Sequence, residues 1–322
     1  MYVARTTAVL SAGLLGAALL TGCAVPSSAP VSGSGHGTVA AAFYPLAWAS
    51  ERVAGDRWTV DNLTSPGGEP HDLELSVNQT LRVSDADLVV YESGFQPAVD
   101  AAVDRTASGA VLDAARVVDL KAFAEEDAHH RGHAGHDSEG GHEGHDHADH
   151  GELDPHFWLD PTRMADLGDA VAERLAELEP RHAATYRANA AALRADLERL
   201  DREYADGLAD CRRNTVVVNH DAFGYLDRYG LEIHPILGIT PEAEPSAGTL
   251  ADLRRVIAED GVTTVFTETL ASPKSAESLA RDAGVRTAVL DPVEGLPSAD
   301  SSEDYLSLMR ANLAALEEAN GC

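Results

Sequence analysis

Histidines supply most of the chemistry that this sequence can perform, and they occur in two kinds of place. His156 stands between a proline and two aromatic residues in the stretch 154–161, where an imidazole would be held and partly dried. A second group runs from His129 to His150 among glycines and acidic residues. Neutral imidazole is a good ligand for zinc and related metals. The contrast predicts one fixed metal ligand beside a flexible segment that gathers metal.

Three further residues stand where partners of His156 would be expected. His220 and Asp291 directly follow apolar, β-branched runs, and His71 lies in the loop after another such run. Ligands of open α/β sheets bind at the carboxyl ends of the strands. Three imidazoles and one carboxylate suit tetrahedral Zn²⁺. We therefore expect one zinc site made by His71, His156, His220 and Asp291, although each residue alone is more often an ordinary hydrogen-bonded side chain.

The histidine tract offers weaker, auxiliary metal binding. Residues 125–152 contain almost nothing apolar, so we expect an exposed, disordered loop that cannot pack around the fixed site. Its candidate ligands are His129, His130, His133, His136, His142, His145, His147 and His150. A plain linker without a metal role is the alternative interpretation.

The N-terminus indicates export. Arg5 precedes an apolar run from Ala8 to Leu20 that is shorter than the ~20 residues of a membrane span, so residues 1–22 are predicted to be a signal peptide. The run ends in Leu-Thr-Gly before Cys23, as in a bacterial lipobox, and we expect Cys23 to carry lipid. Residues 23–37 would be a flexible tether. The protein would then be anchored on the outer face of the cytoplasmic membrane. A buried cysteine in an ordinary signal peptide is the alternative.

Cysteine usage and charge narrow the class of protein. In an exported chain the remaining pair, Cys211 and Cys322, suggests a disulfide bond, with two free thiols as the alternative. The net charge of −29 argues against nucleic-acid binding, which requires clustered Lys and Arg, and suits a soluble exported protein that attracts cations. We expect a monomer.

Strand-like runs alternate with helical patterns on both sides of the histidine tract, which predicts two α/β lobes with parallel sheets. The predicted parts are an N-terminal lobe at 38–178, a long rigid linking helix at 179–210 and a C-terminal lobe at 211–322. Asp160 followed by Pro161 is typical of a helix start. A further helix is predicted at 222–229. The metal site would lie in the cleft between the lobes.

Several motifs together resemble the metal-binding lipoproteins of ABC transporters, the cluster A-I family, and specifically its zinc branch. The resemblance runs from about Val39 to the C-terminus, and its motifs are residues 69–74 (EPHDLE), 154–161 (DPHFWLDP), 219–223 (NHDAF), 241–246 (PEAEPS) and 291–292 (DP). It implies the lobe–helix–lobe fold and ligands at His71, His156, His220 and Asp291. One departure stands at the fourth position, where Asp291 is followed by Pro-Val-Glu-Gly rather than the usual Pro-Leu-Gly, so that another carboxylate or a water could replace Asp291.

The leading hypothesis is a zinc-capturing lipoprotein that hands Zn²⁺ to an ABC permease and its ATPase, with an accessory zinc chaperone as an optional partner, and not an enzyme. A surface adhesin of the same fold is the first alternative. A zinc hydrolase is the second, although catalytic zinc keeps an open position for water and four protein ligands would close the shell.

Overall fold

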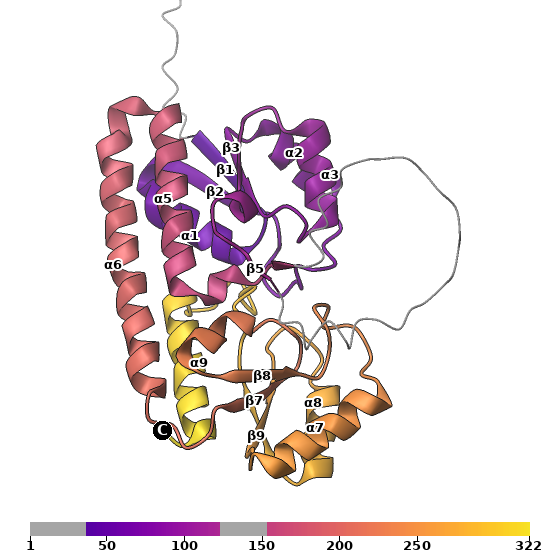
Figure 1. Ribbon diagram of the computed structural model, residues 1–322. Helices are drawn as coiled ribbons and strands as arrows, with labels where there is room; N and C mark the ends of the chain where they lie inside the picture. The colour runs from indigo at the N-terminus through magenta and orange to yellow at the C-terminus, as the bar shows by residue number, and fades with distance from the viewer. Residues whose placement is uncertain (1–36, 123–152) are drawn as a thin grey trace, which may run out of the picture. The chain divides into compact units, whose positions relative to one another are not determined.

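Two parallel sheets form the frame of the chain (Figure 1). The computed structural model describes residues 37–122 and 153–322, which belong to one compact unit. The predicted signal peptide, Cys23 and the whole histidine tract lie outside these residues. Within them, no helix has the length and apolar character needed to cross a membrane.

The first sheet has the strand order β2-β1-β3-β4, with every neighbouring pair parallel. Three helices connect its strands, and the apolar runs of the sequence fill the core beneath them. In chain order the elements are β1 (Gly37–Ala41), α1 (Tyr44–Ala54), β2 (Trp58–Asn62), α2 (Val77–Asp85), β3 (Leu88–Tyr91), α3 (Pro97–Thr106) and β4 (Ala110–Asp113), with short 3₁₀ turns η1 (Gly55–Arg57) and η2 (Ala114–Arg116).

The second sheet has the order β10-β9-β7-β8 and is also parallel. Its first strand therefore lies between the second and third strands of its lobe, as β1 does in the first sheet. The elements are β7 (Thr215–Val218), the 3₁₀ helix η6 (Gly224–Tyr229), β8 (Glu232–Pro235), α7 (Ala247–Glu259), β9 (Thr264–Thr267), α8 (Lys274–Ala283), β10 (Arg286–Val289) and α9 (Tyr305–Asn320). The helix predicted at 222–229 is thus a 3₁₀ helix that begins two residues later.

Between the sheets come a small ribbon and two long helices. Strands β5 (Lys121–Ala122) and β6 (Leu153–Asp154) pair antiparallel, and the 3₁₀ turn η4 (Phe157–Leu159) leads to α5 (Pro161–Leu178). Helix α5 begins as predicted, with the Asp160 side chain accepting a hydrogen bond from Thr162 N and Pro161 in the first turn.

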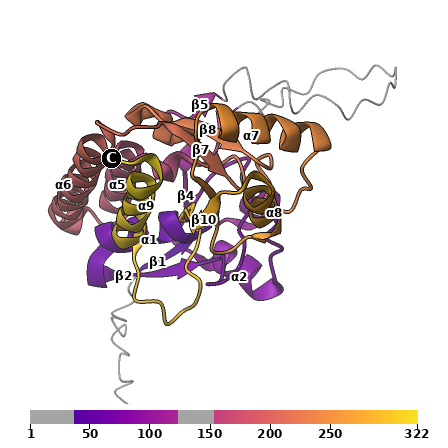
Figure 2. The same ribbon diagram turned by 90° about the horizontal axis from the view of Figure 1, so that it is seen from below.

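The long helix α6 (Ala183–Leu208) follows the turn η5 (Pro180–His182) and extends about 39 Å at 1.5 Å per residue. It packs along α5 and α1 at one end and against α9 at the other, so it connects the two lobes (Figures 1 and 2). The prediction of two α/β lobes, each with a parallel sheet and joined by one long helix, is confirmed. The exact boundaries at 178/179 and 210/211 stay a prediction.

A disulfide bond joins Cys211 and Cys322, as predicted. Cys211 follows α6 and Cys322 follows α9, so the bond ties the end of the linking helix to the C-terminal helix. It lies beside the start of β7, whereas ligands of such sheets bind at the strands' carboxyl ends. The bond therefore stabilises the part of the lobe that faces away from the predicted site.

Candidate metal centre

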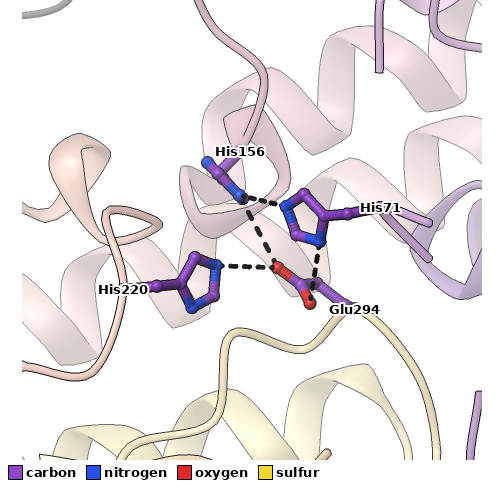
Figure 3. Close-up of side chains that lie close together, drawn as sticks. All are labelled: His71, His156, His220 and Glu294. Atoms are coloured by element: carbon purple, nitrogen blue, oxygen red, sulfur yellow. Dashed lines mark hydrogen bonds and ion pairs between the residues drawn. The ribbon is translucent and has the colours of Figure 1, made fainter. Parts of the chain in front are cut away.

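Three imidazoles and one carboxylate converge between the lobes (Figure 3). His71, His156, His220 and Glu294 are all buried, and one ligand atom from each lies within 4.8 Å of the others. The three ring centroids are each 5.5 Å apart, which makes a nearly equilateral triangle. Three of the four residues predicted from the sequence are therefore brought together.

Glu294 supplies the fourth side chain of this cluster. Its Oε1 atom lies 3.6 Å from His156 Nε2 and 3.4 Å from His220 Nε2, and its Oε2 atom lies 3.9 Å from His71 Nδ1. His71 Nε2 and His156 Nε2 are 3.3 Å apart. Among the described residues, Glu294 Oε1 and His220 Nε2 are buried and make no hydrogen bond, so the long ion-pair contacts of Oε1 with His220 and His156 leave them only partly satisfied. Buried polar atoms without partners are costly, and a bound cation would satisfy them.

The structure places Asp291 differently from the prediction. Its carboxylate accepts hydrogen bonds from Thr269 Oγ1 and from Val293 N at 2.7 Å, so it holds the turn after β10 rather than joining the cluster. Val293 adopts a φ of 59° in this turn. That left-handed conformation, unusual for a β-branched residue, directs the chain so that Glu294 points inward. The structure therefore leaves Asp291 outside the cluster and brings Glu294, three residues further along the chain, into the place expected for it.

Both lobes hold the segment that carries Glu294. Trp158 Nε1 donates to Pro292 O at 2.7 Å, and Gly67 N donates to Leu296 O at 2.7 Å, both from the first lobe. From the second lobe, Asn312 bonds the backbone of Asp291 on both sides. The position of the Glu294 carboxylate is therefore fixed by packing around its own turn.

A carboxylate oxygen forms a hydrogen bond with the Nδ1 atom of each histidine of the cluster. Asp154 Oδ1 lies 2.8 Å from His156 Nδ1, and Glu268 Oε1 lies 2.7 Å from His220 Nδ1. Glu69 Oε1 pairs with His71 Nδ1 in the same way. In every case the same oxygen also accepts the histidine's own backbone N–H, which locks the ring. An acceptor at Nδ1 fixes the proton there and turns the Nε2 lone pair toward the centre, as in many metal sites.

Burial and charge set the protonation of the cluster. Desolvation, followed by the charges of His220 and His71, lowers the pKa of His156 well below its usual value, so this imidazole is neutral. Desolvation also acts to lower the pKa of His220, but the hydrogen bond with Glu268 and the negative charges of Glu268 and Glu294 outweigh it and raise the pKa to about 10. Burial alone would raise the pKa of Glu69, and its bonds to His71 lower it overall.

Aromatic rings close one side of the cluster. Phe95 packs edge-on against His71, with ring centroids 4.8 Å apart, and Trp158 lies 5.2 Å from His156 in the same manner. Gln96 supports the chain before His71 by donating to Pro70 O at 2.9 Å. These contacts keep water away from one face of the histidines, which strengthens electrostatic interactions inside.

Glu92 lies buried near Asp154 and has no hydrogen-bond partner for either oxygen within the described part of the chain. Burial, followed by the charges of Asp154, Asp113 and Asp100, raises its pKa well above the usual value. Burial therefore favours the neutral form of this carboxyl group, which follows β3 near the carboxylate that orients His156.

Two parallel α/β lobes around one buried cluster of three imidazoles and a carboxylate define a two-lobed metal-binding protein. Comparison with known families narrows this class: residues 39–319 match the family described as ZnuA, zinc-uptake complex component A periplasmic. The chain belongs to this family.

Individual relatives agree with the assignment to the family. The zinc-binding lipoprotein AdcA of Streptococcus pneumoniae is 34% identical over 290 residues, which cover 86% of this chain and 54% of AdcA. The chain thus spans about half the length of this curated relative. The Zn(II)-bound ZnuA-like domain of S. pneumoniae AdcA superposes with a TM-score of 0.71 and 31% identity, over 89% of this chain and all of that domain.

A third relative carries a second activity in its description. The laminin-binding protein Lmb of Streptococcus agalactiae, described as bifunctional with adhesin and metal-transporting activity, superposes with a TM-score of 0.74 and 30% identity. The match covers 88% of this chain and 99% of Lmb. The fold therefore occurs in proteins of more than one described role.

Proposed function

We propose that this chain captures Zn²⁺ outside the cytoplasm and delivers it to an ABC-type permease driven by an ATPase. The observation that carries the proposal is the cluster itself: three imidazoles and one carboxylate face a common point, and each imidazole is fixed from behind by a carboxylate. The zinc-binding relatives and the ZnuA family support zinc as the cargo.

The dimensions of the cluster suit zinc. Zn–N bonds of about 2.0 Å in a tetrahedron place neighbouring ligand atoms about 3.3 Å apart. The distances here are 3.3 Å between His71 Nε2 and His156 Nε2, 3.4 Å from Glu294 Oε1 to His220 Nε2, and 3.6 Å from Glu294 Oε1 to His156 Nε2. We therefore assign His71, His156, His220 and Glu294 as the zinc ligands, and Asp291 as a support of the turn that carries Glu294.

The ligand set favours capture of a metal over catalysis with it. Catalytic zinc has three protein ligands and an open position for water. The four assigned ligands would fill a tetrahedral shell and leave no position for an activated water. Nitrogen-rich coordination also favours zinc over manganese, which prefers oxygen ligands.

The anchoring and the auxiliary metal binding belong to the same proposal. A lipidated Cys23 would hold the protein at the outer face of the cytoplasmic membrane, beside its permease. The histidines of 129–150 would bind additional zinc weakly and raise its local concentration near the main site. The name of the AdcA relative, a zinc-binding lipoprotein, supports the anchor.

Adhesion is a second candidate function, favoured by the likeness to Lmb. It would use the outer surface of the fold and would need no transfer of metal. Binding of the purified protein to immobilised laminin, with and without zinc, tests it separately from metal capture.

Elemental analysis of purified protein tests the main proposal. We expect one tightly held zinc after dialysis, and the same single zinc when residues 129–150 are deleted, because the four assigned ligands lie outside that segment. The intact chain should bind additional, weakly held zinc. Protein that retains no zinc in either form would refute the proposal.

A further inference from the structure

The 3₁₀ helix η6 of the second lobe reaches across to the ribbon of the first. The hydroxyl of Tyr225 donates to Asp154 O at 2.7 Å and accepts from Lys121 N at 2.9 Å. Lys121 and Asp154 are register partners in the β5–β6 ribbon. A single phenol from one lobe thus bridges both strands of a ribbon that belongs to the other.

Asp154 has a second role, because its carboxylate is the one that orients His156. Asp154 Oδ1 accepts from His156 N at 3.0 Å and lies 2.8 Å from His156 Nδ1. Both His156 and Asp154 are buried. The backbone that Tyr225 holds and the carboxylate that turns the imidazole therefore belong to one residue. A shift of this backbone would turn the ring of His156.

Gly224, next to Tyr225, packs directly against that carboxylate. A Cβ atom at position 224 would lie 2.6 Å from Asp154 Oδ2, a distance that real Cβ contacts do not tolerate. Lys121 Nζ donates to Gly224 O at 3.1 Å, which fastens the backbone at this close approach. The second lobe thus touches Asp154 twice, at its carbonyl through Tyr225 and at its carboxylate through the bare backbone of Gly224.

The rest of η6 is fixed to the long helices. Arg228 pairs with Asp160 at the start of α5, and Tyr229 Oη donates to Asp201 of α6 at 2.8 Å. The guanidinium of Arg163 lies 5.2 Å above the Tyr225 ring. The contacts of Arg228 with Asp160 and of Arg163 with Tyr225 also run between the lobes, so the hold of η6 on Asp154 depends on how the second lobe sits against the first.

We propose that Tyr225 is a positioning residue for metal retention: with the close approach of Gly224, it holds the Asp154–His156 pair in its metal-binding geometry when the lobes are together. Separation of the lobes breaks the Tyr225 contact, frees the ribbon and lets His156 turn away from the metal. Release of zinc is thereby coupled to lobe opening through one ligand. The inference rests on the proposed function, since it needs His156 to bind zinc.

The test compares Tyr225→Phe with Tyr229→Phe. Each removes one hydroxyl from the same 3₁₀ helix, but only the first loses contact with Asp154. Replacement of a residue that orients a metal ligand typically weakens metal affinity by about 10–100-fold. We therefore expect zinc to dissociate about 10-fold faster from Tyr225→Phe than from wild type. For Tyr229→Phe we expect a dissociation rate within about two-fold of the wild-type rate. Dissociation is followed by transfer of zinc to a chromogenic chelator.

Two further measurements separate positioning from general stability. The visible absorption of bound Co²⁺, which reports tetrahedral geometry, should change in Tyr225→Phe and not in Tyr229→Phe, while the metal-free melting temperatures of the two variants stay similar. Gly224→Ala, which pushes on Asp154 directly, should speed dissociation as well. Equal dissociation rates and equal Co²⁺ spectra in the two tyrosine variants would overturn the inference. A wild-type protein that binds no zinc would instead overturn the proposed function.

Discussion

Replacement of Glu294 by alanine, set beside Asp291→Asn, distinguishes the fourth ligand that we propose from the one predicted by the sequence. Glu294 contributes the only carboxylate of the cluster and faces two imidazoles at 3.4 and 3.6 Å. Asp291 bonds its own turn instead. Replacement of a residue that only orients a ligand weakens metal affinity by up to about 100-fold. Loss of a direct ligand should therefore weaken zinc affinity by at least about 100-fold.

The expected size of the effect follows from ligand linkage. At a free zinc concentration 1,000 times the Kd, binding stabilises the native protein by about 4.1 kcal/mol. For a folded region of about 250 residues, each kcal/mol raises the melting temperature by about 2 °C, so zinc should raise it by about 8 °C. A 100-fold weaker Kd leaves a tenfold excess, about 1.4 kcal/mol and a rise of about 3 °C.

Thermal unfolding with and without zinc at fixed pH measures both variants. We expect the reduced rise for Glu294→Ala and the full rise for Asp291→Asn, because the asparagine oxygen can accept from Val293 N while its NH2 group donates to the hydroxyl of Thr269. Removal of Glu294 also removes a charge that raises the pKa of His220, so protons compete less with zinc for His220 in this variant. The measured loss of zinc affinity is therefore a lower bound on the contribution of Glu294. A full rise in Glu294→Ala with a lost rise in Asp291→Asn would refute the geometric assignment.

Three other outcomes are expected. With a pKa near 10, above the ordinary 6.5, His220 stabilises the metal-free protein fully below pH 6.5 and loses that contribution as pH rises through 10. Because His220 is protonated at pH 7.5 and must lose that proton to bind zinc, binding should release about one proton. Calorimetry in buffers of different ionisation enthalpy measures this release. Glu92→Gln should raise the melting temperature of the metal-free protein more at pH 8 than at pH 5, because a raised carboxyl pKa means that ionisation above pH 4.5 destabilises the native state. Replacing Cys211 and Cys322 by serine opens a loop with a sequence separation of 111 and should lower the unfolding free energy by up to about 4.7 kcal/mol in denaturant titrations, with the zinc Kd unchanged.

The histidines of the centre could be predicted because their positions follow local rules. His220 lies two residues after the end of β7 and His71 lies in the loop after β2, at the carboxyl edges where parallel sheets bind ligands. The two sheets were predictable for the same reason, since β-branched runs alternating with helical patterns are a local property of the chain. The rule also selected Asp291, which comes soon after β10.

Glu294 could not be found in this way because its position depends on a turn. The hydrogen bond from Val293 N to Asp291 and the positive φ of Val293 carry the chain past the strand end before the carboxylate turns inward. A glutamate between a valine and a glycine, in a stretch with little other charge, was the available signal. Glu294 is also the residue at which the sequence Asp-Pro-Val-Glu-Gly departs from the usual Asp-Pro-Leu-Gly of the family.

The carboxylates behind the histidines were partly visible in the sequence. Glu69-Pro70-His71 and Asp154-Pro155-His156 share an acid two residues before the histidine, and in both the same carboxylate oxygen bonds the histidine's N–H and Nδ1. Glu268 gave no such signal, because it reaches His220 from 48 residues along the chain.

The two lobes place an acid at equivalent points and use it differently. Glu268 follows β9 and Glu92 follows β3, each after the third strand of its lobe. Glu268 bonds His220 directly and helps to hold its proton. Glu92 does not bond a histidine, and its pKa is raised by burial and by nearby carboxylates. The carboxylate that orients His156 is instead that of Asp154, in the ribbon that Tyr225 contacts. His220 is thus oriented from within its own lobe, whereas His156 depends on contact between lobes. Opening of the lobes should therefore release His156 before His220, and a zinc ion leaving the site would lose its ligands in that order.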